Sequence, residues 1–222
     1  MISRPNGQAS VDAIKHSEHI PTYGSQLMLF HDAIRSALKG TRGAIVAEFG
    51  VYKGKTLQMI SDRLRWHNIH CNLYGFDSFQ GLPEAYTPYY GKGHFNVSES
   101  DMEQVRRDAM ACDACLIEGY FQDTLESFLF THPGQFRFVH MDADLYQPTK
   151  YVLSTLMDWH RLLPGSVIQF DEMFYVKPDD GRWYWDEYKA WTEFVYRYNI
   201  KYEWIGSYTQ RGAVMLWEVG NE

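Results

Sequence analysis

The sequence is short of basic residues and has no long apolar run. Its 222 residues include 21 Lys and Arg against 28 Asp and Glu, a formal net charge of −7. This balance argues against nucleic acid or an anionic membrane surface as the main partner, because both favour a basic face. No apolar run approaches the roughly 20 residues that span a bilayer, and the polar first residues lack the apolar core of a signal peptide. We therefore expect a cytoplasmic protein with no nucleic-acid or membrane partner.

Cysteine is also scarce, and the three cysteines are too unevenly spaced for a disulfide framework. Cys112 and Cys115 have the C-x-x-C spacing, but no second pair completes a zinc site. We interpret all three as reduced thiols. Aromatic residues, in contrast, make up 16% of the chain, which suggests an aromatic-lined site or an interface such as that of a homodimer.

Apolar spacing predicts strands that alternate with helices. Strands are predicted at 44–48, 72–77, 114–118, 137–141 and 166–170, with a C-terminal hairpin from 202–206 and 214–219 around a turn over 209–212. Helices are predicted near 25–40, 55–66, 100–111, 123–132, 148–163 and 184–198. The alternation predicts an α/β, Rossmann-like fold with a seven-stranded, mostly parallel sheet, an antiparallel hairpin strand at its C-terminal end and helices on both faces.

The first 40 residues stand apart from this alternation. We predict that residues 1–40 form an N-terminal extension and helix, serving as a lid or a dimer contact, and that residues 41–222 form one domain. Residues 1–20 are polar and are expected to be irregular.

The first predicted strand ends at Glu48 and enters a turn with two glycines, Gly50 and Gly54. A strand, a glycine turn and a helix start make a cradle for a small ligand. The turn is one residue too short for a phosphate-binding loop, and Tyr52 stands where the dinucleotide pattern needs glycine. A carboxylate there suits a cation such as S-adenosylmethionine, so we expect this segment, with Thr56, to bind that cofactor. An ordinary turn after a buried strand is the alternative.

Asp77 ends the second strand, where nucleoside sites place a carboxylate that accepts hydrogen bonds from both ribose hydroxyls. Ser78 follows it, and both are predicted to bind the cofactor. Gly119 ends the third strand and would let the backbone pass near an adenine, with a plain turn glycine as the alternative. These positions favour an adenosine compound.

The fourth and fifth strands both end in acids, Asp142 on one and the pair Asp171 and Glu172 on the other. Adjacent parallel strands bring their carboxyl ends together, so Asp142 and Asp171 should converge. Clustered carboxylate oxygens suit Mg²⁺, and we predict these three residues as its ligands. Without a cation the crowded carboxylates would repel one another.

Asp144, two residues beyond the first predicted ligand, is the candidate general base. The metal could lower the pKa of an acceptor hydroxyl while Asp144 takes its proton. Asp142 and Asp144 are thus the predicted catalytic residues, and His94 and His140 are rivals for the role of base.

Four segments together resemble the macrocin O-methyltransferase family: residues 48–52, 75–84, 140–146 and 170–172. The resemblance implies a class I methyltransferase that uses S-adenosylmethionine and Mg²⁺ to methylate sugar or phenolic hydroxyls in natural-product biosynthesis. It places Glu48, Gly50 and Asp77 at the cofactor, and Asp142, Asp171 and Glu172 at the metal. It also implies Asp144 as the base. The family commonly has two aspartates where this chain has Asp171 and Glu172.

Two other functions fit parts of the pattern. Asp142 and Asp144 also form the D-x-D of a glycosyltransferase that holds a divalent cation on a nucleotide-sugar diphosphate, although Glu48 would repel a diphosphate. A non-catalytic module that binds S-adenosylmethionine is the other alternative. The partner in the favoured interpretation is a small molecule with a hydroxyl acceptor. Aromatic residues that could stack on it are Tyr86, Tyr89, Tyr90, Phe174, Tyr175 and Trp183.

Overall fold

The computed structural model describes residues 7–41, 43–176 and 185–219. In these residues seven strands form one sheet in the order β3-β2-β1-β4-β5-β7-β6. The strands are β1 Ile45–Phe49, β2 Asn72–Asp77, β3 Ala114–Glu118, β4 Phe136–Met141, β5 Val167–Phe170, β6 Lys201–Tyr208 and β7 Arg211–Glu218. Strands β1 to β5 are parallel, and β7 runs antiparallel between β5 and β6. The predicted Rossmann-like, mostly parallel sheet with its antiparallel hairpin is confirmed.

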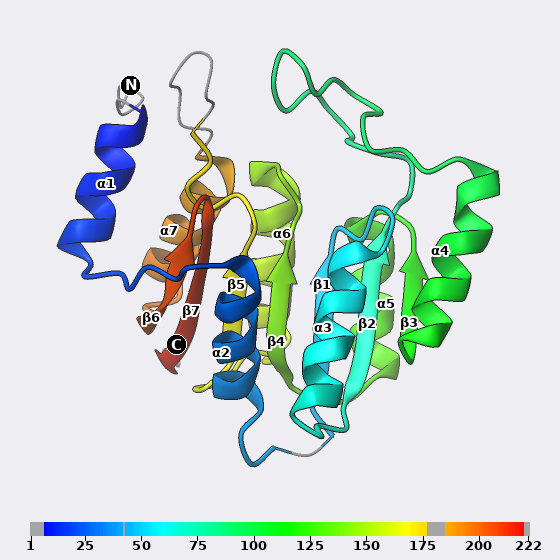
Figure 1. Ribbon diagram of the computed structural model, residues 1–222, viewed down its shortest axis with the longest axis horizontal. Coiled ribbons are helices and arrows are strands. Elements are labelled where there is room, and N and C mark those ends of the chain that lie inside the picture. Colours follow the sequence, from blue (N-terminus) through cyan, green and yellow to red (C-terminus); the bar gives the residue numbers. More distant parts are fainter. Residues whose placement is uncertain (1–6, 42, 177–184, 220–222) are drawn as a thin grey trace.

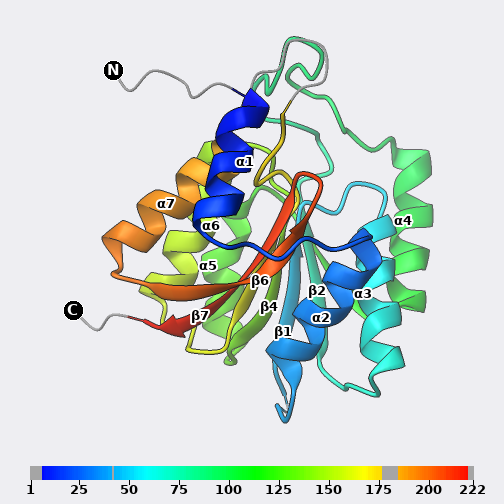
Figure 2. The same ribbon diagram turned by 60° about the vertical axis from the view of Figure 1, so that its left-hand side comes forward.

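Helices cover both faces of the sheet (Figure 1; Figure 2). They are α1 Gly7–Ser17, α2 Gln26–Leu38, α3 Lys55–Trp66, α4 Glu99–Ala111, α5 Phe121–Thr131, α6 Tyr146–Asp158 and α7 Asp186–Arg197. Helices α2, α3 and α4 share one buried apolar cluster with the sheet, and α5, α6 and α7 share the other. None of the described helices is long and apolar enough to cross a membrane.

The N-terminal segment is more regular than the sequence suggested. The predicted irregular stretch contains α1, whose Val11 is buried in the same apolar cluster as α7. The chain then crosses to β6, where backbone hydrogen bonds join Tyr23 to Ser207 and Ser207 to Pro21. Helix α2 follows and lies on the sheet. The proposed division at residue 40, with a lid or dimer contact before it, stays a prediction.

Two helix limits differ from the sequence prediction for local reasons. Helix α4 begins at Glu99 rather than at residue 100, because the Ser98 hydroxyl accepts from the backbone N–H of Asp101 at 3.2 Å and caps it. Helix α6 ends at Asp158 instead of Leu163, because His160 adopts the left-handed conformation with φ 53°.

The C-terminal hairpin is longer and tighter than predicted. The sequence places its turn over 209–212, whereas only Thr209 and Gln210 lie between the two strands. Arg211 and Gly212 therefore belong to β7, and Gly212 pairs with Phe170 at the end of β5. This brings the start of β7 to the carboxyl end of the parallel strands.

The turn between β1 and α3 passes very close to the end of β4. Gly50 has φ 97°, and a Cβ atom there would overlap the carbonyl oxygen of Asp142. The Asp142 backbone N–H donates to the carbonyl of Phe49 at 2.9 Å, which fixes the approach. Gly54, the cap of α3, has φ 78° but has no atom within 4 Å of such a Cβ. Of the two glycines in this turn, Gly50 is thus the one required by both backbone angle and space.

We expect Gly50→Ala to lower the free energy of unfolding by about 3 kcal/mol or more, since overlap adds to backbone strain. Gly54→Ala, which meets the strain without the overlap, should cost about 1–2 kcal/mol. Urea unfolding of both variants measures the difference. Equal losses would contradict the close approach as the reason for glycine at position 50.

Candidate active site

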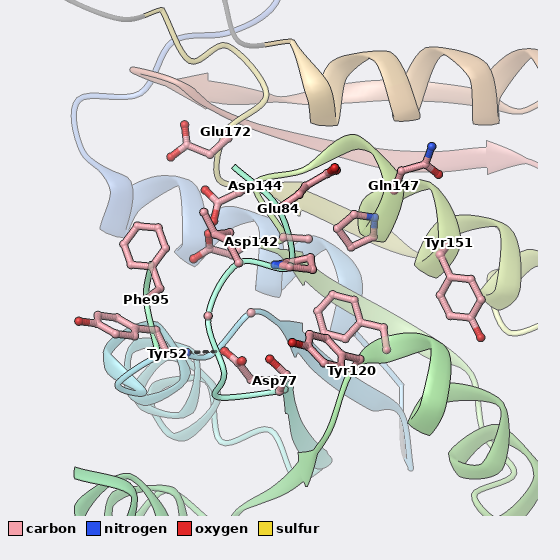
Figure 3. Close-up of a pocket in the computed structure, with 18 of the residues that line it drawn as sticks. Tyr52, Asp77, Glu84, Phe95, Tyr120, Asp142, Asp144, Gln147, Tyr151 and Glu172 are labelled. Carbon is pink, nitrogen blue, oxygen red and sulfur yellow. Dashed lines mark hydrogen bonds between the residues drawn. The ribbon is translucent and has the colours of Figure 1, made fainter. Parts of the chain in front are cut away.

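A cavity of about 610 Å³ opens at the carboxyl end of the parallel strands. Its wall is built from the turn after β1, the end of β2, the loop over 81–84, the start of α5, and the segments that follow β4 and β5 (Figure 3). The loop is held in place by two backbone hydrogen bonds of 2.8 Å, from Leu82 to His94 and from Gly93 to Leu82. The site thus lies where open α/β sheets bind ligands.

Asp77 fastens the glycine turn to the end of β2. Its Oδ2 accepts from the backbone N–H groups of Val51 at 2.8 Å and Tyr52 at 2.7 Å, and its Oδ1 accepts from that of Phe79 at 2.7 Å (Figure 3). Because a carboxylate has about four acceptor positions, Asp77 can still accept a hydrogen bond from a ligand in the cavity. The sequence predicted the ligand contact but not this second role in shaping the turn.

The predicted cofactor residues divide into two groups. Those that line the cavity are Gly50, Tyr52, Asp77 and Ser78. Those that are absent from its wall are Glu48, Gly54, Thr56 and Gly119. The wall beyond Gly119 is instead formed by three residues that the sequence analysis missed, Tyr120, Phe121 and Gln122. Their position directly after the third strand was the available signal.

Glu48 is fully buried and contacts the neighbouring strand rather than the cavity. Its Oε1 lies 3.0 Å from Nδ1 of His140, which is also fully buried, and the ring of Phe30 packs on the imidazole at 5.0 Å. The predicted contact of Glu48 with the cofactor therefore stays a prediction, and the structure shows its carboxylate beside the histidine behind the cavity.

His140 is held between two carboxylates, since its Nε2 also lies 3.7 Å from Oδ1 of Asp171. Burial alone would lower the pKa of His140, but the carboxylates of Asp171 and Glu48 outweigh it and raise the pKa to about 9. A protonated imidazole outside the cavity wall does not suit a general base. His94, the other rival, is also absent from the wall and packs against Tyr90.

The four acids predicted for catalysis and metal binding all line the cavity: Asp142, Asp144, Asp171 and Glu172. Burial, followed by the charges of Asp171 and Asp77, raises the pKa of Asp144 to about 7. Burial and the charges of Asp171 and Asp144 raise the pKa of Glu172 to about 9. Burial and the same neighbours raise the pKa of Asp142. These three acids therefore tend to hold protons unless a cation compensates their charge.

Asp171 is the member of this cluster that has a cationic partner. Arg211 donates from Nε to Oδ1 at 2.6 Å and from Nη2 to Oδ2 at 3.0 Å. Burial would raise the pKa of Asp171, but His140 and Arg211 outweigh it and lower the pKa. The next residue, Glu172, accepts at Oε1 from the Gln210 amide at 3.1 Å. The sequence analysis missed both hairpin residues because it assigned them to a loop.

Glu187 supports the site from behind. This fully buried residue of α7 accepts from the backbone N–H of Ala143 at 3.2 Å and of Glu172 at 2.9 Å. It thereby joins the segments that follow β4 and β5. An acid in the first turn of a predicted helix gave no sign of this role, since such acids usually face solvent.

The predicted metal set, Asp142, Asp171 and Glu172, is gathered at the cavity but not tightly. In the part of the chain that the structure describes, the group with ligand atoms within 4.8 Å of one another is Glu48, His140 and Asp142. Glu172 nevertheless has a buried Oε2 without a hydrogen-bond partner. Such an oxygen, beside further carboxylates, fits a hard cation such as Mg²⁺.

His140 should make stability depend on pH. Its folded pKa of about 9 lies above the unfolded value of about 6.5, so its contribution is complete below pH 6.5 and is lost as the pH rises through 9. We expect the gap in unfolding free energy between wild type and His140→Gln to shrink by about 1–3 kcal/mol between about pH 6 and pH 9.5. Urea titrations across this range measure it, and a constant gap would argue for a neutral histidine.

Comparison with known proteins agrees with this architecture. The chain is similar to the calicheamicin methyltransferase CalS11, with a TM-score of 0.70 and 22% identity over 85% of this chain and 77% of that chain. For the O-methyltransferase NovP the TM-score is 0.66, with 21% identity over 87% and 80% of the two chains. For the O-methyltransferase from Bacillus cereus in complex with SAH it is 0.53, with 13% identity over 97% and 93%.

No curated protein matches the sequence significantly. The narrower resemblance to macrocin O-methyltransferases stays a prediction. The family described as "Methyltransferase domain" matches residues 47–173. Since this match spans more than half of the sequence, the chain belongs to that methyltransferase family.

Proposed function

We propose that the protein is an S-adenosylmethionine-dependent O-methyltransferase that acts on a sugar or phenolic hydroxyl of a small molecule with the help of Mg²⁺. The observation that carries the proposal is the charge of the cavity wall. Among the described residues the wall has no Lys, Arg or His, and its carboxylates are those of Asp77, Glu84, Asp142, Asp144, Asp171 and Glu172. Such a wall suits a sulfonium and an ammonium group and disfavours phosphates.

The cofactor fits along the first three strand ends. Gly50 and Tyr52 would contact its methionine end, and Asp77 would accept from a ribose hydroxyl with its remaining acceptor position. Tyr120 and Phe121 offer an aromatic wall for the adenine. Two of the similar structures are O-methyltransferases, and one of them is in complex with SAH, which supports the same cofactor and the same acceptor atom.

The acceptor belongs at the acid side of the cavity. Asp144 faces the cavity (Figure 3), and its pKa of about 7 is near the optimum for a base at neutral pH. Asp142, Asp171 and Glu172 would hold Mg²⁺, which lowers the pKa of a bound hydroxyl.

The transfer itself is a direct displacement. Bound S-adenosylmethionine would supply the methyl group to the acceptor oxygen and leave as S-adenosylhomocysteine, and Asp144 would take the hydroxyl proton. Holding both reactants at the strand ends would supply much of the rate.

The glycosyltransferase alternative needs a site for a diphosphate. The acidic wall and the absence of basic residues from its described part disfavour that ligand. A non-catalytic module would bind the cofactor without turnover. The assay of methyl transfer to a panel of sugars and phenols distinguishes it from the proposed enzyme.

Asp77→Asn should weaken S-adenosylhomocysteine binding by about tenfold, because a carboxylate acceptor for the ribose is worth 1–2 kcal/mol. Asp77→Asn would also weaken binding by loosening the glycine turn that Asp77 holds. A second ligand is therefore needed to separate this effect from the loss of the ribose contact. Wild type should bind the 2′-deoxy analogue more weakly than the parent compound, and Asp77→Asn should lose that preference. Calorimetry with both ligands provides the test, and an unchanged preference would remove Asp77 from the ribose.

The full protein with S-adenosylmethionine and Mg²⁺ should add a methyl group to at least one member of a panel of sugars and phenols, detected by mass spectrometry. With that acceptor, Asp144→Asn should reduce kcat by a factor of about 10²–10⁴ and leave S-adenosylhomocysteine affinity within about twofold. Binding without methyl gain on any acceptor would favour the non-catalytic module. A full rate in Asp144→Asn would exclude Asp144 as the base.

A further inference from the structure

Arg211 lies directly opposite a predicted metal ligand across the sheet. The β5–β7 ladder ends at the pair Phe170 and Gly212, so Asp171 and Arg211 occupy the next antiparallel position. The Arg211 guanidinium meets both oxygens of Asp171, at 2.6 Å and 3.0 Å. The two side chains are only 18% and 10% exposed, so water screens the pair weakly.

The same register continues one residue further. Gln210 stands opposite Glu172, and its amide donates to Oε1 at 3.1 Å. The turn is fixed in two more places, because Phe174 donates to the carbonyl of Gln210 at 2.7 Å and Lys15 of α1 donates to that of Thr209 at 2.8 Å. The hairpin therefore presents its cation and its amide to the two acids from a rigid position.

Arg211 meets a cluster that has few cations of its own. Buried or half-buried acids gather there: Glu48, Asp142, Asp144, Asp171, Glu172 and Glu187. Among the described residues, the cationic side chains in contact with these acids are His140, behind the cavity, and Arg211, at its edge. Arg211 therefore supplies charge at the place where a divalent cation would supply it.

We propose that Arg211 is the resident counter-ion of this acid cluster and that it lowers the affinity of the cluster for a divalent cation. The inference rests on the proposed metal role of Asp171 and Glu172. A cation that binds Asp171 must share oxygens already occupied by two charge-assisted hydrogen bonds and must lie close to a fixed positive charge. The guanidinium of Arg211 therefore stabilises the acid cluster when no divalent cation is bound, and it makes binding of such a cation less favourable.

Calorimetric titration of Mg²⁺ into the full chain without cofactor tests this directly. Arg211→Gln should bind Mg²⁺ about tenfold more tightly than wild type, because one positive charge near the site is removed. Arg211→Lys keeps the charge and should stay within about twofold of wild type. Mg²⁺ should also raise the Tm of Arg211→Gln more than that of wild type, a difference that a merely structural role would not produce.

Gln210→Lys adds a positive charge near the acids, whereas Arg211→Gln removes one. Because Gln210 is a half-buried turn residue, this variant remains informative if Arg211→Gln does not fold. The added charge beside Glu172 should weaken Mg²⁺ binding by about tenfold. Equal or weaker binding in Arg211→Gln, unchanged binding in Gln210→Lys, or no Mg²⁺ binding by any of the proteins would overturn the proposal. S-adenosylhomocysteine binding, measured in parallel, reports on the proposed cofactor independently of these outcomes.

Discussion

The crowding of carboxylates at one edge of the sheet is the constraint on which the rest of this structure depends. A parallel sheet brings the ends of its strands to one line, and β1, β2, β4 and β5 each place acids there. Buried carboxylates without compensation would either destabilise the fold or hold protons. The surrounding elements supply hydrogen-bond donors or positive charge to these acids.

Compensation takes two forms. Backbone N–H groups satisfy Asp77 and Glu187, which in return fix the glycine turn and the segments after β4 and β5. Cationic side chains pair with Glu48 and Asp171. Of the cavity-facing acids to which we assign chemistry, Asp171 has this cationic partner, whereas Asp142, Asp144 and Glu172 have the least compensation from the protein. The structural acids and the proposed reactive acids thus differ in their partners and not in their residue type.

Much of this arrangement could be predicted from the sequence, because strand ends are marked by apolar runs that stop at an acid. Asp77, Asp142 and Asp171 were placed at the correct edge by that signal alone. Glu48 shows the limit of this signal. In a strand that is buried on both faces, the sequence pattern does not say whether an acid near the strand end points to the cavity or to a neighbouring strand. Glu48 points to the neighbouring strand, where it contacts His140. This contact depends on the adjacency of β1 and β4, which no local sequence pattern reveals.

Residues contributed by non-local pairing were the hardest to predict. Arg211 and Gln210 were assigned to a turn, and only the register between β5 and β7 shows that they face Asp171 and Glu172. A sheet with parallel strands alone would bring further acids or helix starts to this edge. An antiparallel strand instead begins where its neighbours end, so it can deliver a side chain from its first position into their site. The longer Glu172 matches this geometry, since its extra methylene group lets the carboxylate reach across to Gln210 while its backbone N–H is held by Glu187.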